Sequence, residues 1–286
     1  MKRILVQFPK TGLGNLMLVW ARAVVFARLN GLEYVTSGWS SIRWGAWLRN
    51  ERKKRLYLGY FHTEQWWERW QMKWILRFGN IKLEPPIQKL GDQLEKNCYY
   101  LFKDVIVDNN LFGAIQPYRE WIKEELYRVL SPKLKQQLTQ FKVPVIAAHI
   151  RRGDFKMGNP ITPLSHFMSC IHIIRETVGK DLPVTIFSDA DDHELQEILQ
   201  LPEVRRAEEK ADILDILLMS QSQFLLLSQS STFSYWGAFL SEGIAILPEE
   251  DWQECIRNTE NYLDLKISYR NQHSADTLRN ILLRGT

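Results

Sequence analysis

The 286-residue sequence is poor in cysteine. Its three cysteines, Cys98, Cys170 and Cys255, are odd in number and far apart, so they form neither a disulfide framework nor a cysteine metal site. We therefore expect a reducing, cytoplasmic compartment. No secretory leader is visible either, because Met1-Lys2-Arg3 runs directly into a short apolar strand at residues 4–8.

Long hydrophobic runs are also missing. The most apolar stretch, residues 16–29, carries Arg22 and Arg28, so it is too short and too charged to span a membrane. The net charge of +4 is mild and no nucleic-acid-binding motif occurs, so we expect no nucleic acid partner. With 45% apolar and 24% charged residues, the chain has the composition of a soluble globular protein with one large or two ordinary domains.

What is present is an alternation of short apolar runs and helical segments after Lys142-Val143-Pro144. This pattern is typical of βαβ units and predicts a parallel α/β sheet. The expected strands are 145–150, 184–188, 224–228 and 244–247, and the expected helices are 163–178, 191–200, 211–221 and 232–242. We predict an N-terminal domain of residues 1–142, a second domain of residues 143–248, and a partly helical tail, 249–286, that packs back on the first domain.

Charge is concentrated where the strand at 145–150 ends. The run continues as His149, Ile150, Arg151, Arg152, Gly153 and Asp154. In open α/β sheets, ligands bind beyond the carboxyl ends of the strands. A pair of guanidiniums there suits a phosphate or pyrophosphate, because each presents a planar fork of donors. The alternative is a surface arginine pair with Asp154 as its salt-bridge partner.

Two further polar clusters follow expected strands. Ser188 and Asp189 end one strand, and the run Gln229 to Ser234 opens the helix after another. Serine and threonine at a helix start favour an anion, although simple capping explains them equally well. Near the N-terminus, a glycine-rich turn contains Gly12, Gly14 and Asn15, with a helix expected from Leu16. Its spacing matches neither the dinucleotide fingerprint nor a P-loop.

Residues 39–78 contain seven of the eleven tryptophans, together with nine basic and only three acidic residues. Tryptophans 66, 67, 70 and 74 recur at helical spacing. Such a segment is compatible with core packing, with stacking on an acceptor sugar, or with peripheral contact to an anionic membrane.

Four segments resemble the motifs of one family, the α-1,2-fucosyltransferases of glycosyltransferase family 11, in its bacterial form. They are G-L-G-N-L-M (12–17), H-I-R-R-G-D-F (149–155), I-F-S-D-A (186–190) and S-Q-S-S-T-F-S-Y-W-G-A-F-L (228–240), in the family's order. Leu16 and Leu18 depart from the family's opening G-x-G-N-Q-M-F, which weakens the expectation of a galactosyl acceptor.

The resemblance implies a GT-B-like α/β fold of two Rossmann-like domains facing a cleft. It also implies a GDP-fucose donor, no metal or other cofactor, and inverting transfer of L-fucose to a glycan, as an α-1,2 linkage to galactose. Arg151 matches an arginine on the donor β-phosphate, His149 and Asp215 match guanine-binding positions, and Ser231, Thr232 and Phe233 match the segment that cradles the pyrophosphate. With Arg152, Ser188 and Asp189 these residues form the expected donor site.

Two points stay open at this stage. Asp154 is the expected general base, but it could instead orient Arg151 or Arg152. Asp189-Ala190-Asp191 reads D-x-D, as in metal-dependent transferases of a different fold. The competing interpretations are another nucleotide-sugar transferase and a non-catalytic glycan- or nucleotide-binding protein. A lipid-linked precursor of a surface polysaccharide is the acceptor class expected for an enzyme at the inner membrane.

Overall fold

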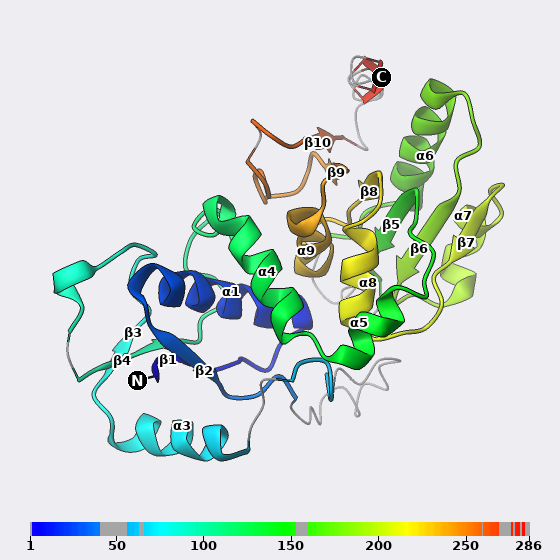
Figure 1. Ribbon diagram of the computed structural model, residues 1–286. Coiled ribbons are helices and arrows are strands. Elements are labelled where there is room, and N and C mark those ends of the chain that lie inside the picture. Colours follow the sequence, from blue (N-terminus) through cyan, green and yellow to red (C-terminus); the bar gives the residue numbers. More distant parts are fainter. Residues whose placement is uncertain are drawn as a thin grey trace. The chain divides into compact units, whose positions relative to one another are not determined.

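The computed structural model describes residues 2–40, 56–62, 66–95, 97–152, 160–258 and 260–268, and in the tail residues 276, 278–280 and 282–283. These fall into two compact units, a first that ends at Gln137 and a second that begins at Leu138 (Figure 1). Each unit is built on its own parallel sheet and is described by itself.

The first unit is a four-stranded parallel sheet in the order β2-β1-β4-β3. Its strands are β1 (Lys2–Val6), β2 (Glu33–Thr36), β3 (Ile81–Leu83) and β4 (Tyr99–Phe102). Its helices are α1 (Leu13–Asn30), α3 (Trp66–Phe78), α4 (Arg119–Val129), α5 (Pro132–Leu138) and the short η1 (Gly91–Gln93) and η2 (Gln116–Tyr118). Helix α1 covers one face of the sheet and α3 the other (Figure 1).

Helix α1 differs from its expected start. It begins at Leu13, directly after Gly12, so Gly14 and Asn15 lie in its first turn and not in a loop. The expected glycine-rich turn is therefore shorter than predicted. Helix α1 is buried along most of its length and ends at Gly31, whose backbone is left-handed (φ 61°), as glycine readily allows.

The second unit is a six-stranded parallel sheet in the order β10-β9-β8-β5-β6-β7. Its strands are β5 (Ile146–Ile150), β6 (Val184–Ser188), β7 (Val204–Arg206), β8 (Phe224–Leu226), β9 (Ile244–Pro248) and β10 (Asp264–Ile267). Its helices are α6 (Leu164–Val178), η4 (Asp192–Leu195), α7 (Gln196–Leu199), α8 (Asp212–Met219) and α9 (Thr232–Leu240). Taken from β7 inward, the order is the 3-2-1-4-5-6 order of a Rossmann fold.

The strands and helices predicted for residues 145–247 are confirmed to within a few residues. Strands β7 and β10 were not predicted, because each is too short to show a periodic pattern. The tail was predicted to pack on the first domain, and the residues of it that the structure describes join the second unit. β10 extends the second sheet, and Leu278 and Leu282 are buried in the core of that same unit.

The tryptophans of residues 39–78 do not share one environment. Trp39 is 1% exposed and packs against the rings of Phe8, Trp20 and Phe61, as the core interpretation predicts. Residues 41–55 and 63–65 lie outside the described residues, so the predictions made on them stay predictions. In the described part of the chain, no helix combines the length and the apolar character needed to cross a membrane.

Candidate donor site at the carboxyl ends of β5, β6 and β8

The site lies at the switch point of the second sheet, where the order of successive strands reverses. Strand β5 is central, with β6 on one side and β8 on the other. The chain therefore leaves β5 and β8 in opposite directions along the sheet, and in open α/β sheets ligands bind beyond the carboxyl ends of the strands at such a point. Polar side chains follow each of these three strands, and most belong to the motifs identified in the sequence.

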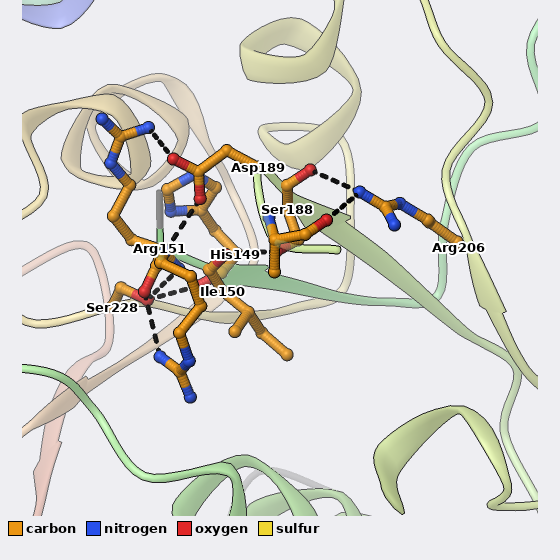
Figure 2. Close-up of polar contacts among 9 residues, drawn as sticks. His149, Ile150, Arg151, Ser188, Asp189, Arg206 and Ser228 are labelled. Carbon is orange, nitrogen blue, oxygen red and sulfur yellow. Dashed lines mark hydrogen bonds and ion pairs between the residues drawn. The ribbon is translucent and has the colours of Figure 1, made fainter. Parts of the chain in front are cut away.

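Two serines tie these strand ends together (Figure 2). The Ser228 hydroxyl donates to the carbonyl of His149 (2.7 Å) and accepts the N–H of Arg151 (2.9 Å). The Ser188 hydroxyl donates to the carbonyl of Ile150 (2.6 Å). Both serines thus fix the path of the chain after β5. Ser188, expected to contact the donor, has its hydrogen engaged within the sheet.

Asp189 orients Arg151. Its Oδ2 lies 2.5 Å from Nη1 of Arg151, and its Oδ1 accepts the backbone N–H of Arg152 at 2.8 Å (Figure 2). The side chains of Arg151 and Asp189 are 22% and 23% exposed, so a ligand can reach the guanidinium. The sequence named Asp154 as the expected general base, with the orientation of Arg151 or Arg152 as its alternative role, and both stay predictions. Asp154 lies outside the described residues.

The two adjacent arginines are not equivalent. Arg152 is only 7% exposed, and its guanidinium donates to the carbonyl of Arg151 at 2.9 Å. Burial lowers the pKa of Arg152, against the opposing effect of the charges of Glu194 and Asp189. Arg151 is therefore the better placed of the pair to contact an anion.

Arg206, at the end of β7, supports the turn that carries Asp189. Its guanidinium donates to the carbonyls of Ala190 (2.6 Å) and Ser188 (3.3 Å) (Figure 2). It also pairs with Asp192. Arg206 is not part of any motif in the sequence, and the strand that carries it, β7, was not predicted.

The D-x-D sequence does not act as a pair. Asp189 binds Arg151, whereas the Asp191 side chain accepts a backbone N–H in a reciprocal capping box with Glu194 at the start of η4. Among the described residues, no three His, Cys, Asp or Glu side chains gather as a group that could hold a metal ion.

The loop into α9 is held by a buried carboxylate. Ser230 has a left-handed backbone (φ 55°), and its N–H donates to Asp251 at 3.1 Å. The Tyr235 hydroxyl donates to the same carboxylate at 2.6 Å. Asp251 is 4% exposed, and burial raises its pKa although these donors oppose the rise. Neither Asp251 nor Tyr235 was singled out in the sequence.

Helix α9 begins without the side-chain cap that its sequence suggests. Ser231 occupies the N-cap position, but its hydroxyl makes no capping hydrogen bond. Thr232 and Phe233, which follow it, are half-buried. The simple capping interpretation of this serine is therefore wrong, and the segment starts a helix whose dipole favours an anion.

Both residues expected at the guanine site, His149 and Asp215, contact neighbouring side chains. The buried His149 ring lies 5.1 Å from the ring of Phe233, so the end of β5 meets the start of α9. Asp215, in α8, is 7% exposed and lies 3.2 Å from the ammonium of Lys210. Lys210, whose side chain is 5% exposed and lies over the ring of Phe187, was not singled out in the sequence.

No protein-family model matches the sequence, and no curated protein matches it. Solved structures do match. NodZ, an α-1,6-fucosyltransferase of Bradyrhizobium whose crystal was soaked with GDP-fucose, is 14% identical with a TM-score of 0.50, over 85% of this chain and 94% of NodZ. The E. coli heptosyltransferase WaaC, with ADP-2-deoxy-2-fluoro heptose, is 9% identical with a TM-score of 0.52, over 99% of this chain and 100% of WaaC. At these identities the likeness concerns the fold, and the fold is the two-unit α/β fold of GT-B glycosyltransferases.

Proposed function

We propose that this chain is an inverting glycosyltransferase that moves L-fucose from GDP-fucose to a hydroxyl group of a glycan. One observation carries the proposal: Arg151, partly exposed and paired with Asp189, lies at the switch point of the second sheet, where the serine- and threonine-rich start of α9 also lies. The resemblance of these segments to α-1,2-fucosyltransferase motifs supports the choice of donor, as does the fold shared with NodZ.

The chemistry requires stabilisation of a leaving diphosphate. The acceptor oxygen attacks the anomeric carbon of fucose, the bond from that carbon to the β-phosphate oxygen breaks, and GDP departs with the extra negative charge. Arg151 and the N-terminus of α9 stabilise this charge without a metal ion. The acceptor proton passes to a general base, for which Asp154 is our candidate. The engagement of Asp189 and Asp191 elsewhere supports the metal-free scheme.

We assign the base of the nucleotide to the surroundings of His149, Phe233 and Asp215. The Watson–Crick edge of guanine carries N–H donors that a carboxylate such as Asp215 accepts, and adenine lacks the ring N–H of that edge. The WaaC crystal contains an adenine nucleotide on the same fold, so an ADP-sugar transferase is the second candidate. Nucleotide preference separates the two.

We further propose an acceptor that is the glycan of a lipid-linked surface-polysaccharide precursor, and a cytoplasmic location. The motif resemblance points to the 2-hydroxyl of galactose. Leu16 and Leu18, in α1 of the first unit, depart from the family signature, and acceptor preference is where we expect that departure to matter.

The test is thermal unfolding with GDP, UDP, ADP or CDP, each with and without EDTA. A ligand at about 100 times its Kd stabilises the native state by about 2.7 kcal/mol, which raises Tm by roughly 5–10 °C in a protein of this size. We expect this shift with GDP alone, unchanged by EDTA. A shift with ADP alone would replace the donor by an ADP-sugar, and a shift lost with EDTA would contradict the metal-free scheme.

Turnover is the second readout. With GDP-fucose and an array of β-galactoside acceptors, we expect release of GDP together with a fucosylated product. Selective binding of GDP without turnover on any acceptor of the array would favour the non-catalytic binding protein.

A further inference from the structure

Helix α3 exposes an aromatic stripe on the face that points away from its sheet. The stripe consists of Trp67, Trp70, Trp74 and Phe78, which are 53%, 66%, 65% and 65% exposed. The opposite face carries Met72 and Ile75, which are buried in the core of the first unit. The helix is thus anchored on one side and presents large rings on the other. Soluble proteins rarely expose apolar side chains side by side, and where they do the patch marks an interaction surface.

The stripe is narrow, continuous and flanked by positive charge. At 3.6 residues per turn, its four rings fall within an arc of about 80°. The rings of Trp74 and Phe78 pack at 5.6 Å. On one flank the Lys73 ammonium lies 5.2 Å from the ring centroid of Trp70, and the Arg77 guanidinium 5.6 Å from that of Phe78. The acid of this helix, Glu68, lies about 100° from Trp67, toward the buried face.

We propose that this stripe, with Lys73 and Arg77, lies in the interface of an anionic membrane. Tryptophan prefers the boundary between headgroups and hydrocarbon, because its ring is apolar and its N–H is polar. Lysine and arginine beside the rings are attracted to anionic lipid. A glycan-binding role fits less well, because the rings stand on a convex helix face and small-ligand sites are concave. The proposal depends on neither the donor nor the catalytic chemistry.

The first experiment removes the rings. A Trp70→Ala/Trp74→Ala variant is compared with wild type in flotation with phosphatidylcholine vesicles that contain phosphatidylglycerol. Each ring that enters the interface removes on the order of 100 Å² of apolar surface from water, so we expect binding to fall at least about tenfold per ring. The matched control is Trp252→Ala, since Trp252 is 49% exposed in the second unit. The Tm of each variant confirms that it is folded.

The second experiment removes the charges. Each basic residue near an anionic surface contributes about fivefold in binding, so Lys73→Gln/Arg77→Gln should weaken binding to phosphatidylglycerol vesicles by about 25-fold. Binding to pure phosphatidylcholine should not change. The control is Lys180→Gln/Arg205→Gln, which removes two exposed positive charges from the second unit.

Several outcomes would overturn the proposal. They are flotation of the Trp70→Ala/Trp74→Ala variant equal to that of Trp252→Ala, wild type that binds no vesicle, and equal loss of binding in the charge variant and its control. Light scattering that shows a dimer dissociated by the Trp70→Ala/Trp74→Ala change would assign the stripe to a second copy of this chain. Tryptophan emission that shifts on addition of soluble glycan, and not of vesicles, would assign it to a sugar.

Discussion

Two arginines of the second unit face carboxylates, and they differ in how far the fold satisfies them. Arg257 is 1% exposed, and its guanidinium donates to Asp264 at 2.7 Å and to three backbone carbonyls at 2.8–2.9 Å. Arg151 pairs with Asp189 at 2.5 Å, yet 22% of its side chain remains exposed. We call these the closed pair (Arg257–Asp264) and the open pair (Arg151–Asp189).

The two pairs have the same chemistry, but their different exposure assigns a structural role to the closed pair and makes the open pair a candidate for ligand binding. The closed pair joins the segment after β9 to β10 and lies at the edge of the sheet. The open pair lies where β5 and β6 end, at the edge where open α/β sheets in general bind their ligands. A guanidinium whose donors are all satisfied by the protein is unsuited to a phosphate, whereas one that is oriented and still reachable is suited to it.

The largest effect should come from breaking the closed pair. Arg257→Ala leaves Asp264, whose side chain is 3% exposed, as a buried charge without its partner. We expect the free energy of unfolding to fall by about 3–5 kcal/mol, measured by urea denaturation. Arg279→Ala is the control, because its pair with Glu176 is 44% and 45% exposed and should contribute at most about 1 kcal/mol. Equal losses in the two variants would mean that burial does not distinguish them.

The open pair should show the reverse pattern. In the proposed function, Arg151 contacts the leaving diphosphate, so we expect Arg151→Ala to lower kcat about 100- to 1,000-fold. The free energy of unfolding should change by about 1 kcal/mol or less, because the pair is partly exposed. Arg205→Ala, an exposed arginine on β7, is the control for activity. A loss of stability in Arg151→Ala as large as that of Arg257→Ala would contradict the division into open and closed pairs.

The sequence was sufficient for the parts of this fold that have strong local patterns. The buried strand β5 is an apolar run that ends in charge, and the motifs around His149, Asp189 and Ser231 lie at strand ends as predicted. Which arginine would be exposed was not predictable, because Arg151 and Arg152 are adjacent and of one type. Their difference depends on contacts with Asp189 and with the Arg151 carbonyl, which only the folded chain brings together.

Three residues of the site were not predicted from the sequence, and the physical reason is the same for each. Asp251, Lys210 and Arg206 lie in or beside short irregular segments, and each acts on a partner that a sequence pattern does not connect to it. Asp251 bonds to Ser230, 21 residues earlier in the chain. The exposure of Trp67, Trp70 and Trp74 was equally hidden, because the sequence does not show that Met72 and Ile75 are the residues of α3 that pack in the core.

A third prediction concerns the buried imidazole of His166 in the second unit. His166 is 3% exposed, and burial lowers its pKa from 6.5 to about 4, against the opposing effect of Glu250. The native state therefore resists protonation where the unfolded state accepts it. Stability is complete above pH 6.5 and is lost as the pH falls toward 4, by up to about 3 kcal/mol. Urea denaturation across this range should show a smaller pH dependence in His166→Gln, and equal slopes would contradict the prediction.

The smallest effect on stability is expected from Tyr235, which shares features with both the closed pair and the open pair. Its hydroxyl donates to Asp251, which is as buried as the closed pair. Asp251 nevertheless holds the loop into α9, at the same end of the sheet as the open pair. Tyr235→Phe removes one hydrogen-bond donor from that carboxylate, so we expect the free energy of unfolding to fall by about 1.5 kcal/mol.

Because Asp251 also holds the strained backbone of Ser230, the start of α9 should lose its fixed position in this variant. The stabilisation by GDP should then shrink together with the intrinsic Tm. In Tyr127→Phe, which removes the hydroxyl of a tyrosine that is 40% exposed, neither quantity should change. A Tyr235→Phe variant that loses stability and keeps its full response to GDP would place Tyr235 with Arg257, as part of the fold alone.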